Sequence, residues 1–380
     1  NLLTIGDYYR QRYGKGIEVF CSSAIILSYL GWVAAQITAL GLVFSVLTQG
    51  AMSETAGMIV GTLAVLIYVV VGGFLAVALT DFIQMIVLVV GLSVIAYFSS
   101  MLAGGAGQVF AMAEQRDLWR FLPPATLNDI LFFVAAAVTM MFGSIPQQDV
   151  FQRVMSAKDA PTARTGAIIG GASYIMFAFV PMFIVASAVL VMGDAGLAMA
   201  KDDYQRLLPT FVMTKMPLVM QIIFFGALLS AIKSTSSATL LAPSTSFVEN
   251  ILKHLRPGMS DREQLLATRI SIVVFAALVL AYAIAMQGTS IYELVSTAYQ
   301  VTLVAAFVPL VVGMYWKRAT TQGAILSVAL GLGTWIMSFP QVSGFGAVFP
   351  GQLAGLLAAF IGMFAGSVLP QVLKDRGDDS

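Results

Sequence analysis

The chain has 380 residues, of which 59% are hydrophobic and only 10% are charged. Because soluble proteins carry about 25% charged residues, this composition excludes an ordinary soluble domain and predicts a polytopic membrane protein. The 20 basic residues nearly cancel the 19 acidic ones, so no basic surface for nucleic acid is expected. One cysteine, Cys21, and one histidine, His254, exclude an intramolecular disulfide, a catalytic triad built on either residue and a multi-histidine metal centre.

Ten apolar segments are predicted to be membrane-spanning helices, each of which needs about 20 mostly apolar residues. They are rich in Leu, Ala, Met and Phe without strict alternation, which favours helices over a transmembrane barrel. The chain begins at Asn1 in a polar stretch and shows no signal peptide, so we expect its true N-terminus to lie upstream. The segments cover residues 17–47, 55–72, 76–102, 128–150, 165–192, 217–252, 264–287, 291–315, 322–339 and 350–371.

Basic residues fall mainly on one side of the predicted membrane. When the connections are assigned alternately to two sides, the side with residues 1–16 carries fourteen of the 20 Lys and Arg residues and the other side carries five. Because loops rich in Lys and Arg stay in the cytoplasm, we predict a plasma or inner membrane protein with both ends of this chain cytoplasmic. The remaining basic residue, Lys233, lies inside a span.

An acidic residue, Asp81, lies a few residues into the segment 76–102, with Thr80 and Gln84 beside it. Ionisable residues inside a span usually line a cavity or a pathway for ions. Asp81 is therefore predicted to lie on a cation path. The alternative is a carboxylate near the cytoplasmic mouth of the helix that its polar neighbours cap.

A helix break is predicted in the segment 128–150, where Gly143 and Pro146 lie close together. A break inside the membrane persists only where it lines a cavity, and in secondary transporters such breaks present free carbonyls to substrates and ions. Gln147 and Gln148 are therefore candidate substrate contacts, and Gly143 and Pro146 are candidate flexing points. The alternative is an ordinary helix end at the cytoplasmic surface.

Ala231, Ser234 and Thr235 share one helical face of the segment 217–252. The Ala231 carbonyl and the two hydroxyls predict a cluster of oxygen atoms of the kind that a hard cation binds. The alternative is packing of small residues, with the hydroxyls bonded back to their own helix.

Lys233 lies about 200° around that helix from Ala231, so it does not share the oxygen-rich face. It is too deep in the span for its ammonium to reach the membrane surface easily. Three interpretations stay open: the ammonium is structural in a watered crevice, it pairs with a deep carboxylate such as Asp81, or its proton replaces part of a coupling cation.

Trp32 and Gln36 share a face of the segment 17–47 by their four-residue spacing. An aromatic ring beside a polar group suits an organic cation or a zwitterion, although a packed aromatic residue is the alternative. Gln300, in the segment 291–315, is a similar candidate for contact with a substrate.

The order and spacing of three motifs resemble the sodium:solute symporter family. These are the opening run Thr4–Gly14, the glycine pair Gly72-Gly73 with Thr80-Asp81-x-x-Gln84, and the run Gly143–Arg153 with its helix break. The resemblance implies an all-α, inverted-repeat core of five plus five helices, here lacking its first helices. It also implies one transmembrane domain over 1–380, in which 17–102 complete the first repeat, 128–315 form the second and 322–371 are accessory.

The family's shared sodium site implies specific ligands on this chain. It places the Ala231 carbonyl and the Ser234 and Thr235 hydroxyls around Na⁺, and Asp81 near the exit of the ion or at a second site. Ser237 matches a second-site position, but the next residue, an alanine, lacks the hydroxyl that some two-sodium members carry there.

The high-affinity choline transporter branch gives the nearest resemblance within the family. Trp32 falls on one wall of that branch's aromatic cage, whereas Gln147 stands where the branch places a second cage residue, a tryptophan. Losing one wall removes a cation–π contact of about 0.5–2 kcal/mol. A glutamine there favours hydrogen bonding to a carboxylate or polyol, so the substrate is not assigned as choline.

We therefore predict a sodium-coupled symporter, not an enzyme, that imports a small organic solute by alternating access. The solute is an amino acid, a quaternary amine, a carboxylate or a sugar. The alternatives are a transporter-like sensor domain of a signalling protein and a proton-coupled transporter that uses Lys233. A channel would require a continuous polar stripe, and the sequence shows isolated polar clusters instead.

Overall fold

The structure is a computed structural model that describes residues 2–118 and 120–373, with the backbone alone for residues 71–81. Within these residues every regular element is a helix, so the predicted all-α class is confirmed. The first half comprises α1 (Ile5–Tyr13), α2 (Lys15–Leu47), α3 (Glu54–Leu102), α4 (Ala106–Gln115), α5 (Leu127–Phe142), α6 (Gln148–Met155), α7 (Ala160–Met192), α8 (Asp194–Asp202) and α9 (Tyr204–Lys215). The second half comprises α10 (Leu218–Phe247), η1 (Val248–Leu252), α11 (Lys253–Leu255), α12 (Asp261–Ala285), α13 (Ile291–Thr302), η2 (Leu303–Phe307), α14 (Val308–Tyr315), α15 (Thr321–Met337), η3 (Phe345–Ala347) and α16 (Gly351–Val368).

The described helices account for all ten predicted spans. Seven are long and apolar enough to cross a membrane, and three shorter apolar helices, Glu54–Val70, Leu127–Phe142 and Thr321–Met337, correspond to the others. One boundary was wrong: the segments 55–72 and 76–102 form a single helical element, α3, rather than two. The glycine pair between them costs about 1 kcal/mol per residue in a helix, and without a proline no backbone donor is lost there.

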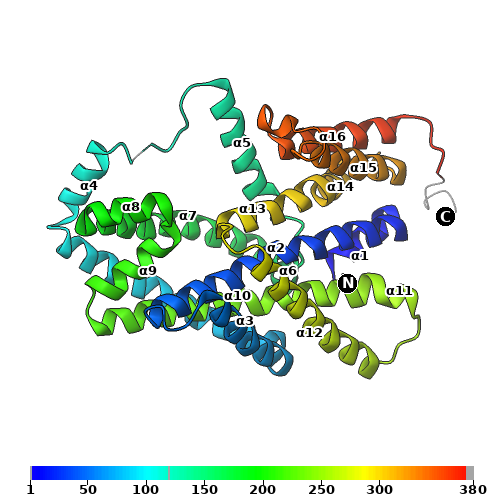
Figure 1. Cartoon of the computed structure of the whole chain (residues 1–380). Helices are drawn as coiled ribbons and strands as arrows, with labels where there is room; N and C mark the ends of the chain where they lie inside the picture. The colour runs from blue at the N-terminus through cyan, green and yellow to red at the C-terminus, as the bar shows by residue number, and fades with distance from the viewer. Residues whose placement is uncertain (1, 119, 374–380) are drawn as a thin grey trace.

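The short helices α1, α4, α6, α8, α9 and α11 lie wholly or mostly outside the predicted spans, because each is too short to cross a membrane. Figure 1 shows α4, α8 and α9 at one end of the molecule, with α1, α11 and the last turns of α16 toward the opposite end. We call the second end, which carries Arg10, Arg12, Lys253 and Arg256, the basic end. These four basic residues, from two parts of the chain that are distant in sequence, therefore lie at the same end of the molecule.

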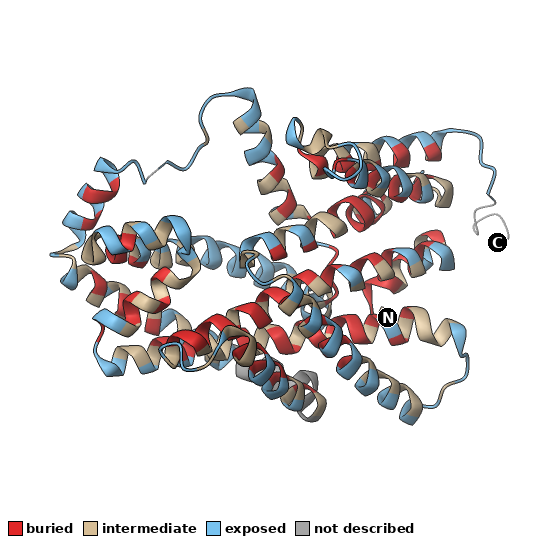
Figure 2. Ribbon diagram, in the orientation of Figure 1, coloured by how far each residue is buried: buried red, intermediate tan, exposed pale blue. Residues whose placement is uncertain are grey.

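The core is built around α2, which packs against α3, α10, α12 and α13. Buried residues are most numerous in α2, and Figure 2 shows them concentrated in the middle of the molecule. Two glycines of α2 allow close backbone approach: a Cβ on Gly31 would lie 2.8 Å from the carbonyl oxygen of Leu294, and one on Gly41 would lie 2.7 Å from that of Glu54. Small residues at helix contacts are typical of membrane bundles, where backbones approach closely.

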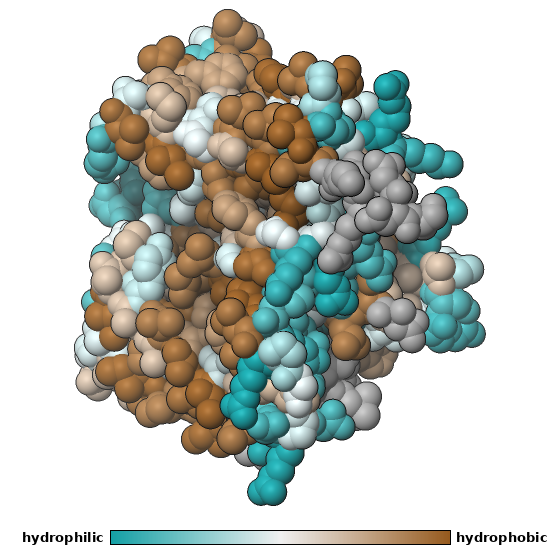
Figure 3. Space-filling model, turned by 90° about the vertical axis from the view of Figure 1, so that its right-hand side faces the viewer, coloured by the Kyte–Doolittle hydropathy of each residue, from teal (hydrophilic) through white to brown (hydrophobic). Residues whose placement is uncertain are grey.

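The outer helices expose apolar side chains rather than charged ones. Along the first half of α7 most residues are exposed, among them Ile168, Tyr174 and Met176. Viewed from the basic end, hydrophilic side chains form a band beside large apolar areas (Figure 3). An exposed apolar surface of this extent on helices of spanning length fits the hydrocarbon of a bilayer. The chain is therefore a multi-pass membrane protein.

Candidate functional site

The predicted break between α5 and α6 is present and is anchored to α13. Helix α5 ends at Phe142, and residues 143–146 form turns before the extended N-cap of α6 at Gln147. A Cβ on Gly143 would lie 2.4 Å from the carbonyl oxygen of Tyr299, so only glycine fits against this backbone. The Thr302 hydroxyl donates to the Gly143 carbonyl oxygen at 2.6 Å. One of the carbonyls freed by the break is thus satisfied by α13.

The end of α13 that contacts the break is also irregular, because Thr302 is followed directly by the π-helix η2. The ring of Phe142 stacks on that of Phe307, with their centroids 5.0 Å apart and their planes at 5°. The Tyr9 hydroxyl donates to the carbonyl oxygen of Ala306 at 2.9 Å. π-Helical turns inside α-helices often occur at functional sites, and here one lies directly against a broken helix.

The two predicted glutamines after Pro146 have different surroundings. Gln147 is 2% exposed and its Nε2 donates to Ser28 Oγ at 3.2 Å, while its Oε1 has no hydrogen-bond partner among the described residues. The fully buried Gln148 accepts from the backbone N–H of Ile5 at 2.8 Å and donates to the carbonyl of Leu3. The side-chain oxygen of Gln147 is therefore an available hydrogen-bond acceptor beside α2. Gln148, in contrast, is hydrogen-bonded to the backbone at the start of α1.

Trp32 and Gln36 lie on the less buried face of α2, since the residues between them are buried. The Trp32 ring is 5.4 Å from that of Tyr299, at an interplanar angle of 31°. The two rings form an aromatic wall between α2 and α13. Gln300 does not join it: its Oε1 accepts from the indole N–H of Trp335 on α15 at 3.0 Å.

The predicted cation ligands lie on the more open face of α10. Ala231, Ser234 and Thr235 are partly exposed. The Thr235 hydroxyl makes no hydrogen bond within the described part of the chain, whereas the Ser237 hydroxyl donates to the carbonyl of Lys233 at 2.7 Å. The same back-bonding at 2.7 Å is made by the buried Ser236 and Thr239. The buried hydroxyls thus donate to their own helix, whereas the Thr235 hydroxyl makes no such bond.

Lys233 contacts an aromatic ring that the sequence did not single out. Its Nζ lies 3.6 Å from the centroid of the Tyr68 ring on α3. A cation–π contact is worth about 0.5–2 kcal/mol, with the larger values where the ammonium is desolvated. The predicted pairing of Lys233 with Asp81 is not tested, because the side chain of Asp81 lies outside the described residues.

A second contact missed from the sequence holds α6 to α2. The Tyr29 hydroxyl donates to Asp149 Oδ1 at 2.5 Å and accepts from the backbone N–H of Asp149 at 2.9 Å. Asp149 also pairs with Arg153 at 3.3 Å. The carboxylate that follows the break therefore belongs to a contact between helices. Only the position of Tyr29 one turn before Trp32 could have indicated it.

The donors available for a cation are oxygen atoms of hydroxyls and carbonyls. Among the described residues no group of three or more His, Cys, Asp and Glu side chains could hold a metal ion. Hard monovalent and divalent cations bind oxygen ligands of the kind found on the open face of α10.

Comparison with known proteins identifies the family of the chain. Residues 1–331 match the sequence model of the sodium:solute symporter family. The chain is 26% identical over 371 residues to the sodium/pantothenate symporter of Haemophilus influenzae, covering 95% of this chain and 75% of that protein. It is 27% identical over 344 residues to the high-affinity choline transporter 1 of Caenorhabditis elegans, covering 87% of this chain and 58% of the relative. The named relatives are transporters rather than enzymes.

A solved structure shares the fold. The chain superposes on a Na⁺-coupled sialic acid symporter in its substrate-bound, outward-open state with a TM-score of 0.76 at 20% identity. The match covers 98% of this chain and 78% of the other. The predicted secondary-transporter fold is thereby confirmed. With the family match extending over most of its length, the chain belongs to the sodium:solute symporter family.

Proposed function

We propose that this chain carries out sodium-coupled import of a small organic solute by alternating access. The observation that carries the proposal is the open face of α10, where the free Thr235 hydroxyl lies one turn from the Ala231 carbonyl. Membership of a family of sodium symporters supports Na⁺ as the coupling ion. The chain covers 58% to 75% of its named relatives, and the activity proposed is that of the whole transporter.

The proposed sodium site consists of the Ala231 carbonyl and the hydroxyls of Ser234 and Thr235. Uncharged oxygen ligands suit a monovalent ion, because a single positive charge needs fewer carboxylate ligands than the double charge of a divalent ion. Ser237 donates its hydroxyl proton within the helix and keeps its oxygen lone pairs for a cation. We assign Asp81 to the path by which the ion leaves, and one sodium to each cycle.

The proposed solute site is the aromatic wall of Trp32 and Tyr299, with Gln36 and Gln147 as its polar groups. An aromatic wall attracts a cationic group of a solute, and the amides bind a carboxylate or hydroxyl. Amino acids, quaternary amines, carboxylates and sugars all remain within this class. The relatives transport solutes as different as pantothenate and choline, according to their names.

One sodium ion supplies useful driving force. Moving one charge down a potential of 100 mV releases about 2.3 kcal/mol, and at about 1.4 kcal/mol per decade this supports roughly 50-fold accumulation of solute. We propose that α5, α6 and α10 rock against the other helices, with Gly143 and Pro146 as flexing points. Sodium would favour the state that is closed at the basic end and open at the other, and would raise solute affinity reciprocally.

The basic end is proposed to be cytoplasmic, in a plasma or inner membrane. It carries Arg10, Arg12, Lys253 and Arg256, and loops rich in Lys and Arg remain on the cytoplasmic side. Both ends of this chain would then face the cytoplasm. We also propose a single transporter domain, in which the hairpin of α15 and α16 is accessory to the two repeats; this hairpin packs together beside α14 (Figure 1).

A second candidate coupling mode is favoured by Lys233. Its ammonium lies in a span, one residue before Ser234, and contacts the Tyr68 ring. In a proton-coupled transporter this lysine would carry the proton in place of part of the cation requirement.

The deciding experiment is a solute panel measured by thermal shift on the purified protein, with Na⁺ and with K⁺ at equal ionic strength. We expect the solute to raise the melting temperature more in Na⁺ than in K⁺, because the two sites are coupled. Uptake of that solute into proteoliposomes should then require an inward sodium gradient. Uptake driven equally by a proton gradient without Na⁺ would contradict sodium coupling and support the Lys233 mode.

A further inference from the structure

The side-chain amide of Gln147 is buried at the break between α5 and α6, and only half of it is hydrogen-bonded. Its Nε2 donates to Ser28 Oγ of α2 at 3.2 Å. Its Oε1 has no partner in the described part of the chain. Because Gln147 is only 2% exposed, bulk water does not supply the missing donor. A buried acceptor that stays unpaired is costly, so we expect a donor to reach this oxygen when the site is occupied.

The orientation of the Gln147 amide is fixed by Ser28. The Ser28 hydroxyl donates its proton to the carbonyl oxygen of Ile25 at 2.7 Å, so its oxygen can only accept from Gln147. Turning the amide over would place Oε1 against that oxygen, with no proton between the two acceptors. The Nε2 group therefore stays on Ser28, and Oε1 is left for a hydrogen-bond donor.

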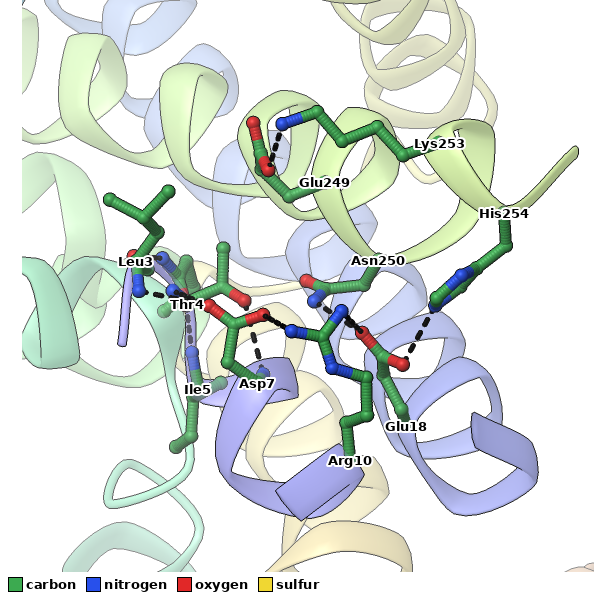
Figure 4. Close-up of polar contacts among 11 residues, drawn as sticks. Leu3, Thr4, Ile5, Asp7, Arg10, Glu18, Glu249, Asn250, Lys253 and His254 are labelled. Carbon is green, nitrogen blue, oxygen red and sulfur yellow. Dashed lines mark hydrogen bonds and ion pairs between the residues drawn. The ribbon is translucent and has the colours of Figure 1, made fainter. Parts of the chain in front are cut away.

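A buried carboxylate at the basic end shows how such groups are ordinarily satisfied. The Oε2 of the fully buried Glu18 lies 2.7 Å from Nε2 of His254, and its Oε1 accepts from Asn250 Nδ2 at 3.0 Å. Figure 4 shows these side chains converging on the Glu18 carboxylate from different elements. Both carboxylate oxygens meet a partner from the chain itself, as is usual for buried polar groups. Among the described residues the Gln147 oxygen has no equivalent partner.

Three of the buried atoms without a partner in the described residues are amide oxygens, those of Gln84, Gln147 and Asn250. A hydroxyl can turn to donate to a new partner, whereas an amide oxygen can only accept. Of the three, Gln147 is the one bonded to the face of α2 that carries Trp32, because Ser28 lies four residues before Trp32. The unpaired oxygen of Gln147 thus belongs to the proposed solute site.

One helical turn, about 6 Å, separates the level of Ser28 from that of Trp32 along α2. The rings of Trp32 and Tyr299, which lie 5.4 Å apart, attract a cation within about 6 Å of a ring centroid. A protonated amine satisfies both features, because its charge suits the rings and its N–H suits the Gln147 oxygen. A quaternary amine has the charge but no N–H, a sugar has donors but no charge, and a carboxylate has neither.

We propose that Gln147 Oε1 accepts a hydrogen bond from a protonated amine, so that the solute carries at least one ammonium N–H, as an amino acid does. The inference rests on the solute site proposed above and narrows the class of solute that binds there. Gln147 contacts the solute, whereas Ser28 is a positioning residue that acts through the Gln147 amide. A site built to hydrogen-bond a group strongly rejects analogues that lack this group.

The test uses matched cations that differ by one methyl group. Trimethylammonium keeps one N–H and tetramethylammonium has none, so this pair separates hydrogen bonding from charge and aromatic contact. N,N-dimethylglycine and glycine betaine form a second pair, in which a carboxylate is added. Affinities are measured on the purified full chain from the shift in melting temperature with ligand concentration, in Na⁺ and in K⁺ at equal ionic strength.

We expect the member of each pair with an N–H to bind about 10- to 100-fold more tightly, because its quaternary partner leaves the buried oxygen unpaired. Gln147→Leu, which removes the acceptor and keeps similar bulk, should abolish this preference. Ser28→Ala should reduce it, because the released amide can turn its Nε2 toward the solute. Ser23→Ala is the matched control: its hydroxyl donates to the carbonyl of Val19 at 2.7 Å, and the parental preference should remain.

The outcomes separate this inference from the proposed function. Equal effects of the two members of each pair, including no effect of either, overturn the amine assignment, and so does a preference that persists in Gln147→Leu. If the preference is present but all affinities are the same in Na⁺ and in K⁺, sodium coupling is wrong while the amine assignment stands. If the members of a pair bind equally and Na⁺ strengthens both, sodium coupling stands and the amine assignment falls.

Should Gln147→Leu fail to fold, Ser28→Ala decides, because this change removes a single oxygen atom. A parental preference in Ser28→Ala would then overturn the assignment, since the amide orientation would not govern which solute binds. Lower stability alone does not alter the preference between two ligands of one pair, so the ratio of their affinities separates positioning of the amide from a structural role.

Discussion

The ammonium of Lys233 on α10 lies 3.6 Å from the centre of the Tyr68 ring on α3. Lys233 is the only charged residue in α10, and it immediately precedes the proposed sodium ligand Ser234. A fixed positive charge therefore accompanies the open face on which a mobile cation is proposed to bind. Contact with an aromatic ring stabilises that charge.

Replacing Lys233 with leucine should increase the dependence of transport on sodium. Leucine removes the ammonium but occupies a similar volume. The variant therefore has no side-chain positive charge on α10 that could replace a bound sodium ion. We expect a steeper dependence of uptake on Na⁺ concentration, whereas Lys233→Arg should behave like the parent. The measurement is initial uptake in proteoliposomes over a sodium titration. An unaltered titration in Lys233→Leu would assign the ammonium a structural role only.

Alanine at Ser234 or Thr235 should weaken sodium binding. A hydrogen bond or ligand contact to a charged group is worth about 1.5–3 kcal/mol, which corresponds to about 10- to 150-fold in affinity. The matched control is Ser236→Ala, because that buried hydroxyl is already bonded to the carbonyl of Ile232. Sodium affinity follows from the shift in melting temperature with Na⁺ concentration. Parental affinity in both ligand variants would refute the assigned site.

The parts of the molecule that depend on local chemistry could be predicted from the sequence. Membrane spans follow from runs of apolar residues, so the described helices cover all ten. The break after Phe142 follows from glycine and proline at fixed positions, which act on their own backbone. The continuous helix of α3 was missed because two glycines lower helix stability without forbidding the helix.

The contacts between helices could not be predicted in the same way. Which side chain meets Lys233 depends on the rotation of α3 against α10, and nothing in the local sequence of Tyr68 encodes it. Gln148 shows the same limit, since adjacent glutamines lie on different faces and one of them serves the start of α1. The roles of single polar residues are decided by packing over long sequence separations.

Alanine at Gly143 should destabilise the protein. Its Cβ would overlap the carbonyl oxygen of Tyr299, a backbone atom that cannot move without displacing α13. Overpacking of this kind costs about 1–3 kcal/mol. Gly226→Ala is the matched control: no atom lies within 4 Å of its added Cβ, and alanine gains about 1 kcal/mol in helix propensity. Thermal melting of both purified variants should move in opposite directions, and a melting temperature of Gly143→Ala at or above the parent would contradict the close contact.

Phenylalanine at Tyr29 should loosen the helix that follows the break. The change removes one hydroxyl and leaves both the Asp149 carboxylate and its backbone N–H without that partner. Leaving buried polar groups unsatisfied costs about 1–3 kcal/mol, and more for a charged group. Tyr315→Phe, at an 83% exposed position, should have little effect.

Hydrogen exchange localises the change caused by Tyr29→Phe. Amides of α6 should exchange faster in this variant, while those of α15 keep their parental rate. Because Asp149 would retain only Arg153, raising the salt concentration should widen the difference for α6, since salt screens the more exposed of its two contacts. Equal exchange of α6 in both proteins would mean that α13, rather than α2, holds the broken helix in place.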